Sequence, residues 1–121
     1  AYANRPDSPY YEQAKQTPEA YCIVYFEVAP GQFIEISPAS LNQKPHPAFN
    51  EQIGYSHFGV VVADIQKTRA FLIEKGVDID VEPKIGNSHT WQMWIHDPDG
   101  NRIEIMQYTK DSYQVIGHID E

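Results

Sequence analysis

The chain has 121 residues and a composition typical of a globular protein, so we expect a domain-sized unit with a packed hydrophobic core. Its net charge of −8 argues against partners such as nucleic acid or an anionic membrane surface. An anionic small molecule stays open, because a bound metal can reverse the local charge. The sequence has no long apolar run, and Cys22 is its one cysteine, so we expect a reducing, cytoplasmic environment.

Residues 1–37 are predicted to form an arm followed by a β-hairpin. Prolines and tyrosines mark residues 1–19 without a clear period, and a short helical turn is expected at Glu12–Lys15. Residues 20–28 are rich in β-branched and aromatic side chains, which predicts a strand. After a turn, Phe33–Ser37 is its predicted hairpin partner.

Residues 38–52, which hold three prolines among polar side chains, are predicted to be a linker. A complete module over 53–108 follows, and a tail over 109–121 ends the sequence. The expected elements of the module and tail are strands at 53–63, 77–81, 89–95, 102–108 and 113–119, a loop at 83–88, and a helix between the N-cap Asp64 and the stop signal Gly76. The order within the module is therefore β-α-β-β-β.

A turn and strand at His96–Met106 is the most informative segment. Pro98 and Gly100 suit a tight reversal, after which side chains alternate between the two faces of a strand. A similar segment occurs upstream at Pro30–Ile36, where Glu35 aligns with Glu104 as in an internal repeat. We therefore predict an α+β fold with two related β-α-β-β-β modules, the second complete and the first partial.

Three side chains in predicted strands, Glu35, His57 and Glu104, are candidate metal ligands. Imidazole and carboxylate groups suit Zn, Mn, Fe, Co or Ni, and three such ligands leave room for water or substrate. Spacing alone does not decide the matter, since single strand histidines and glutamates are more often structural or solvated.

The module resembles the vicinal oxygen chelate superfamily, also called the glyoxalase/bleomycin-resistance/dioxygenase fold. The similar residues are Tyr55–Val62, Asp64, Glu74–Val77 and Asp97–Gln107. This resemblance implies that two β-α-β-β-β modules pair around a divalent metal. The nearest branch is the glyoxalase I-like one.

That branch implies a ligand set in which Glu35 matches the first-module glutamate, and His57 and Glu104 match the second-module ligands. No residue matches the ligand on the first strand of the first module. The resemblance further implies a lyase or isomerase acting on a small carbonyl or hemithioacetal through an enediolate, with glutathione or another thiol as part of the substrate. Glu104 is then the expected catalytic base, and Glu35 is the second carboxylate, expected on the opposite side of the metal.

Two other functions stay open: a metal-dependent dioxygenase on the same fold, and a metal-free small-molecule binding protein like the bleomycin-resistance members. We also expect a homodimer, or pairing with a missing upstream segment, because the hairpin at 21–37 holds a large apolar surface. The other histidines, the cysteine and the side chains of the strand at 89–95 are not expected to bind metal or substrate. We expect solvated histidines at 46, 89, 96 and 118, a small core residue at Cys22, and aromatic and thioether side chains more typical of core than of a pocket at Trp91, Met93 and Trp94.

Overall fold

The computed structural model describes residues 6–7, 11–16, 23–39, 43–45, 47–48 and 51–117. It divides into two compact units, Ala1–Lys44 and Pro45–Glu121. Within the described ranges, no helix is long and apolar enough to cross a membrane.

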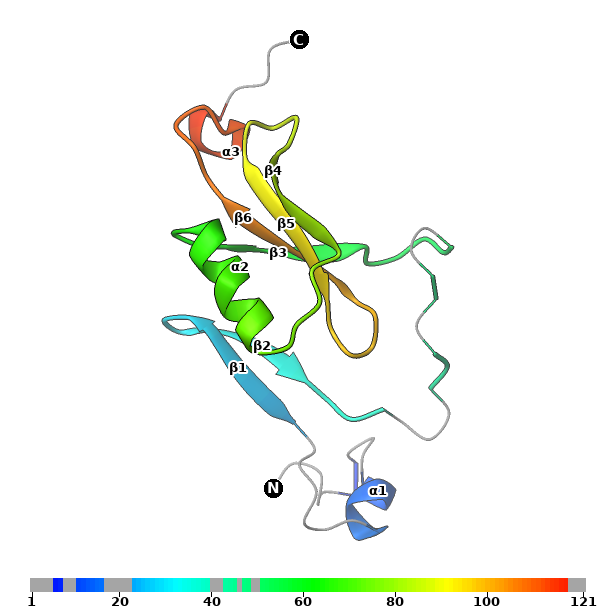
Figure 1. Ribbon diagram of the computed structural model, residues 1–121. Coiled ribbons are helices and arrows are strands. Elements are labelled where there is room, and N and C mark those ends of the chain that lie inside the picture. Colours follow the sequence, from blue (N-terminus) through cyan, green and yellow to red (C-terminus); the bar gives the residue numbers. More distant parts are fainter. Residues whose placement is uncertain are drawn as a thin grey trace. The chain divides into compact units, whose positions relative to one another are not determined.

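The first unit contains a short helix α1 (Tyr11–Gln16) and the antiparallel hairpin β1 (Val24–Ala29) and β2 (Gln32–Ile36), shown in blue and cyan in Figure 1. Gly31 lies in the turn with φ +74°, and its N–H donates to Glu27 Oε1 at 3.0 Å. The short helix and the hairpin are confirmed. The paired strand begins at Val24, and residues 20–22 of its predicted range lie outside the described residues.

The hairpin places different side chains on its two faces. Pairing of Tyr25 with Glu35 and of Glu27 with Phe33 brings these four residues to one face, where the Tyr25 and Phe33 rings meet edge to face at 6.4 Å. The other face is apolar, and most of its side chains are exposed within this unit: Val24, Phe26 and Ile36 are exposed and Ile34 is half-buried.

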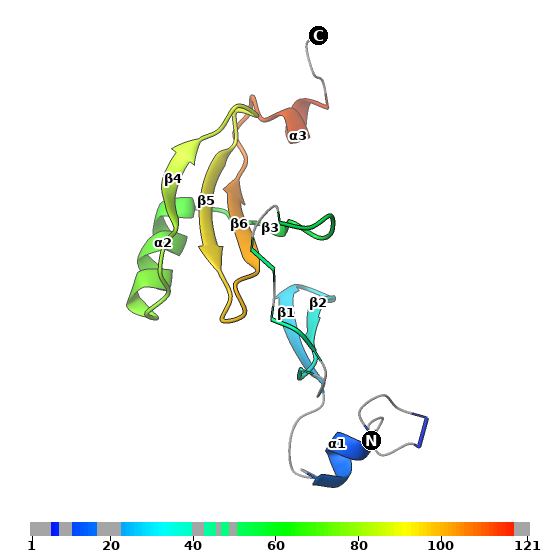
Figure 2. The same ribbon diagram turned by 90° about the vertical axis from the view of Figure 1, so that its right-hand side faces the viewer.

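The second unit is a four-stranded sheet with a helix against one face. Its elements are β3 (His57–Val61), α2 (Ile65–Glu74), β4 (Val81–Ile85), β5 (Trp91–His96), β6 (Arg102–Gln107) and a terminal turn of helix α3 (Tyr113–Ile116). The strand order is β3-β6-β5-β4, with β3 parallel to β6 and the other pairs antiparallel. Figure 2 shows β4, β5 and β6 side by side, in the order that they have in the sheet. The predicted β-α-β-β-β order and α+β class are confirmed.

Alternation along the strands builds the core between α2 and the sheet. The fully buried apolar side chains are Ile65 from α2, Met93 and Ile95 from β5, and Ile105 from β6. Half-buried neighbours complete it: Val60, Val62, Leu72, Val77, Ile79, Trp91 and Ile103. Trp91 and Met93 therefore belong to the core, as predicted.

Two side-chain acceptors fix the start of α2. Asp64 Oδ1 accepts a hydrogen bond from Lys67 N at 3.0 Å, which confirms the predicted N-cap and lowers the pKa of that carboxyl. Gln107 Oε1, from the end of β6, accepts from Ile65 N at 2.8 Å. The helix is thus joined to the last strand at its first turn, and Gly76 follows its other end with φ +79°.

The predicted strand at 77–81 and loop at 83–88 were wrong, because the strand is Val81–Ile85. Val77 and Ile79 pack against the core without joining the sheet, so their apolar alternation reflects burial. Pro83 is tolerated within β4 because this is an edge strand with irregular pairing between Val81 and Lys84.

The predicted strand at 113–119 was also wrong within the described residues. Tyr113–Ile116 form α3, which ends at Gly117 in the left-handed conformation with φ +64°. Ser112 is fully buried, and its Oγ accepts a hydrogen bond from Thr109 N at 2.8 Å. These local bonds favour a turn of helix over extended chain.

Candidate functional site

The sheet face opposite α2 carries several polar side chains of β3, β5 and β6. Strand pairing arranges them in rows, since partners in register share a face. His57, Arg102 and His96 form one row, and Gly59, Glu104 and Trp94 form the next. A third row holds Val61, Met106 and Gln92. We call this surface the open face.

His57 and Glu104 meet diagonally on the open face. His57 Nε2 lies 3.6 Å from Glu104 Oε2, and the two side chains are 35% and 18% exposed. This distance exceeds that of a direct hydrogen bond. It fits two ligands of one ion, because donors about 2.1 Å from a tetrahedral metal lie roughly 3.4 Å apart. The pair therefore has the chemistry and spacing of two ligands of a divalent transition metal.

Ser56 orients the imidazole. Its Oγ lies 2.6 Å from His57 Nδ1, so one of the two atoms donates a proton to the other. If Nδ1–H donates to the hydroxyl, the Nε2 lone pair faces Glu104 and can bind a metal. If the hydroxyl donates, Nε2 carries the proton and donates toward the carboxylate. The same contact thus supports either a metal ligand or an acid–base pair.

Aromatic and cationic side chains border this pair. The Trp94 ring meets the His57 ring at 4.8 Å between centroids with an interplanar angle of 67°. Arg102 lies over the same indole, with its Cζ 4.2 Å from the ring centroid. Trp94, for which we expected a core position, instead faces the site.

Gly59 makes room beside Glu104. A Cβ at position 59 would lie 2.6 Å from Met106 Cε, so the thioether of Met106 occupies the space that a side chain would fill. Glycine here allows a closely packed apolar border next to the carboxylate.

Of the three predicted ligands, His57 and Glu104 are brought together and Glu35 belongs to the other unit. Glu35 lies exposed on β2, on the hairpin face that also carries Glu27. Its convergence with the other two stays a prediction. Among the described residues, no three His, Cys, Asp or Glu side chains gather into a group that could hold a metal ion.

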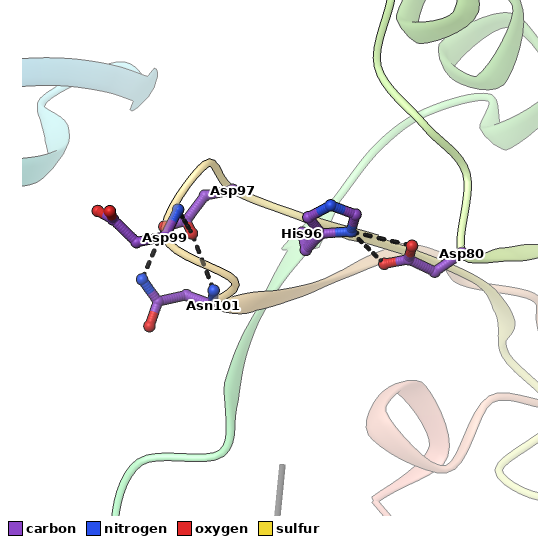
Figure 3. A network of polar contacts seen from close by, with 5 residues as sticks. All are labelled: Asp80, His96, Asp97, Asp99 and Asn101. Carbon is purple, nitrogen blue, oxygen red and sulfur yellow. Dashed lines mark hydrogen bonds and ion pairs between the residues drawn. The ribbon is translucent and has the colours of Figure 1, made fainter. Parts of the chain in front are cut away.

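The other histidines have separate surroundings. His96 Nδ1 contacts both carboxylate oxygens of Asp80 at 2.8 and 2.9 Å, and Figure 3 shows the ring directed toward that carboxylate. This hydrogen bond, followed by the negative charges of Asp80, Asp78 and Asp97, raises the pKa of His96. His96 is thus exposed as predicted but paired. His46, His118 and Cys22 lie outside the described residues.

The predicted strand at 89–95 begins with His89, but in the structure β5 begins two residues later, at Trp91, and His89 precedes it. It adopts φ +57° in the turn before β5, and its ring packs against Tyr113 at 5.3 Å. Its carbonyl accepts hydrogen bonds from Thr109 Oγ1 and Ser112 Oγ. These contacts join the turn to the segment before α3 and give His89 a structural part.

The turn between β5 and β6 is built around Asp97, also seen in Figure 3. Its Oδ1 accepts from Asp99 N at 3.0 Å and Asn101 N at 2.8 Å, and its Oδ2 accepts from Asn101 Nδ2 at 2.8 Å. Gly100 has φ +85°, as the sequence predicted for a reversal at this position. The turn sets the register that places Trp94 opposite Glu104.

Three residues of the site were missed by sequence reasoning: Ser56, Gly59 and Arg102. Arg102 was recoverable, since it lies two positions before Glu104 on one strand and therefore on the same face. Ser56 and Gly59 gave no separate signal, because their contacts depend on side-chain conformation and on the pairing of β3 with β6.

Comparisons with known proteins agree with this fold. The family model described as the glyoxalase/bleomycin resistance protein/dioxygenase superfamily matches residues 10–105. No curated protein matches the chain. A glyoxalase family protein from Enterococcus faecalis is 24% identical over 69% of this chain and 65% of its own, with a TM-score of 0.60.

Two further structures are similar. A Bacillus anthracis protein assigned to the glyoxalase family is 23% identical over 81% of this chain and 68% of its own, with a TM-score of 0.55. A superfamily member from Sphaerobacter thermophilus is 27% identical over 46% of this chain and 44% of its own, with a TM-score of 0.42. Our chain covers less than two thirds of the Enterococcus and Sphaerobacter proteins. With the family model matching most of its length, the chain belongs to the glyoxalase/bleomycin resistance protein/dioxygenase superfamily.

Proposed function

We propose that the protein is a metal-dependent lyase or isomerase of glyoxalase I type, acting on a small carbonyl or hemithioacetal substrate. The observation that supports this most directly is the 3.6 Å approach of His57 Nε2 to Glu104 Oε2 on the open face. Superfamily membership supports it further, since the superfamily includes enzymes of this kind. The substrate would carry glutathione or another thiol.

His57 and Glu104 would hold the metal, with Glu35 as the proposed third ligand. When bound, a divalent ion such as Zn, Ni, Co, Mn or Fe would act as a Lewis acid on two neighbouring substrate oxygens. Ser56 would hold the His57 ring in place through Nδ1, and Trp94 would restrict its rotation from the side. The chain's own residues thus fix the direction in which Nε2 points.

Glu104 is the proposed base. Its low exposure, 18%, and its neighbours Trp94 and Met106 limit the water around the carboxylate. A carboxylate with little solvent nearby can take a proton from carbon next to a carbonyl and later return it. Glu35, the proposed second carboxylate, would transfer a proton on the other face of the substrate.

Elemental analysis of protein purified without chelator is the first test. We expect stoichiometric metal in the wild type and its loss in His57→Ala and Glu104→Ala. His89→Asn and Glu74→Gln are matched controls, since Asn tolerates the positive φ of position 89 and Glu74 is exposed on α2. Full metal content in both site variants would refute the proposal.

Catalysis is tested separately. Glu104→Gln should reduce turnover of hemithioacetals by a factor of about 10²–10⁴, the usual contribution of a general base. Oxygen consumption distinguishes the dioxygenase alternative, and binding without metal distinguishes the bleomycin-resistance type of protein. Turnover unaffected by Glu104→Gln would remove this residue from the reaction.

We also propose that a second copy of the chain, or an upstream segment, covers the apolar hairpin face of the first unit and completes the ligand set. Val24, Phe26 and Ile36 are all exposed there. Sedimentation should show an assembly, and a monodisperse 13.9 kDa species would contradict this. We expect the activity in the cytoplasm, where the thiol of Cys22 stays reduced.

A further inference from the structure

Gln92 on β5 carries a side-chain amide that the fold does not use. Gln107 accepts a hydrogen bond from Ile65 N, which joins β6 to α2, and the Gln114 amide of α3 accepts from Thr90 Oγ1. The half-buried Gln92 makes no hydrogen bond to a residue that the structure describes. No buried side-chain nitrogen or oxygen in that part of the chain lacks a partner, so the Gln92 amide is open to solvent.

Gly86, directly after β4, determines where this amide lies. A Cβ at position 86 would be 2.4 Å from Gln92 Nε2 and 2.9 Å from Gln92 Cδ, so the amide group lies over the glycine. Gly86 is itself fixed, because its N–H donates to Thr90 O at 2.9 Å. The contact restricts the Gln92 side chain before any ligand arrives, and less conformational entropy is then lost on binding.

Strand register places Gln92 on the open face, one row beyond Glu104. Gln92 is paired with Met106, and the adjacent row pairs Trp94 with Glu104. Alternate residues of a strand lie about 7 Å apart, which sets the spacing between these rows. Trp94 and Met106 contribute an indole and a thioether to the surface between the two polar groups. A ligand that extends from the His57–Glu104 pair to Gln92 therefore crosses an apolar stretch and ends at a polar group.

The amide of Gln92 offers both halves of a hydrogen-bonding pair. Its Nε2 donates and its Oε1 accepts, and a carboxamide on a ligand can satisfy both atoms at once. A carboxylate or an ester accepts but cannot donate, so either would leave Oε1 without a donor. The net charge of −8 further disfavours a carboxylate, although Lys84 lies in register with Gln92 and carries the opposite charge. The chemistry favours a neutral carboxamide.

We propose that Gln92, held over Gly86, binds a carboxamide group of the substrate and so determines specificity on the open face beyond Glu104. This inference rests on the proposed function for the reacting end of the substrate, which approaches His57 and Glu104. The preferred substrates then combine a reactive carbonyl end, a short apolar chain and a carboxamide. Substrates that end in an ester or a carboxylate would lose one of the two hydrogen bonds.

The first experiment uses the metal-free chain and glutaramide, an uncharged diamide. NMR follows the side-chain NH₂ resonances of Gln92 during the titration, with Gln92→Met to assign them, and we expect a saturable shift in the wild type. Gly86→Ala keeps Gln92 but displaces its amide, and should weaken binding at least about fivefold, the contribution of roughly one hydrogen bond. Gln66→Met, at an exposed position of α2, is the matched control and should leave the affinity unchanged.

Two further titrations belong to this experiment. Glutarate and dimethyl glutarate have the length of glutaramide but no N–H donor, so neither should reproduce the shift. In the wild type, glutaramide should also shift the backbone N–H resonance of Gly86, and Gln92→Met should abolish that shift.

The second experiment uses zinc-loaded protein and two suberic hydroxamates, which chelate the metal at one end. The other end is a primary carboxamide in one compound and a methyl ester in the other, and the chain between them is long enough to reach the next row of the sheet. By calorimetry, the wild type should bind the carboxamide at least about fivefold more tightly. Gln92→Met should abolish the difference and leave the affinity for the ester unchanged.

The two experiments separate the two ideas. Absence of a glutaramide shift in the wild type, an equal shift with glutarate, or full binding by folded Gly86→Ala or Gln92→Met would overturn the role of Gln92. Equal affinities of the wild type for the two hydroxamates would overturn the substrate class. If neither hydroxamate binds the zinc-treated wild type, the proposed metal function fails, and the glutaramide result still decides on Gln92. Circular dichroism checks the fold of each variant, and Gly86→Ala provides a second reading if Gln92→Met does not fold.

Discussion

The two methionines of the chain test which face of the sheet is core and which is open. Met93 on β5 is 0% exposed and packs with Ile95 and Ile105, whereas Met106 on β6 is half-buried on the opposite face. Met93→Ala should cost about 2–5 kcal/mol, because it loses the transfer free energy of a buried side chain and leaves a cavity under α2.

Met106→Ala should cost about 1 kcal/mol. Full burial of a methionine contributes about 1.5–3 kcal/mol, about half of that applies here, and truncation on an open face leaves no closed cavity. Urea unfolding followed by circular dichroism gives both free energies, with unchanged m-values as the check that only stability has altered.

An equal loss in the two variants would refute this reasoning about the faces. It would mean that Met106 is buried in the intact protein, so the face carrying His57 and Glu104 would be covered rather than open to substrate.

Three further outcomes are expected. Because the pKa of His96 is raised in the folded protein, its pairing with Asp80 stabilises the fold fully below about pH 6.5, the ordinary pKa of histidine. This stabilisation is lost as the pH rises through the higher pKa of the folded state. Asp80→Asn should therefore flatten that part of a curve of unfolding free energy against pH. Gly100→Ala should destabilise by about 1–2 kcal/mol in urea unfolding because of its φ of +85°, whereas the same change at Gly54, where no positive φ occurs, should cost less. Gly59→Ala should displace the flexible end of Met106 with a small effect on stability, and calorimetry should show a changed affinity of the proposed metal site beside it.

Local sequence signals predicted the parts of the fold that short-range physics determines. The Asp97–Asn101 turn, the Asp64 cap and the Gly76 stop each depend on contacts between residues a few positions apart, and all three are present. The strand around Pro83 was missed because its edge position depends on the order of strands in the sheet. Tyr113–Ile116 was assigned to a strand because four residues contain too little periodicity to distinguish it from a helical turn.

The site was predicted only in part for a related reason. Residue types and spacing made His57 and Glu104 candidate ligands, and the resemblance favoured their convergence, but their contact requires the parallel pairing of β3 with β6. The position of Trp94 beside them required the register of β5 against β6. Alternation along a strand indicates that residues share a face, but register decides which neighbours they meet.

The strand order has a consequence for how the His57–Glu104 pair forms during folding. β5 and β6 are joined by a short turn and can pair early, which brings Arg102 and Glu104 beside Trp94 at low entropic cost. β3 reaches β6 only after α2, β4 and β5 have been spanned by the chain, so this non-local pairing is the slower step. We therefore expect His57 to join Glu104 late, so the proposed metal site would form only when folding is complete.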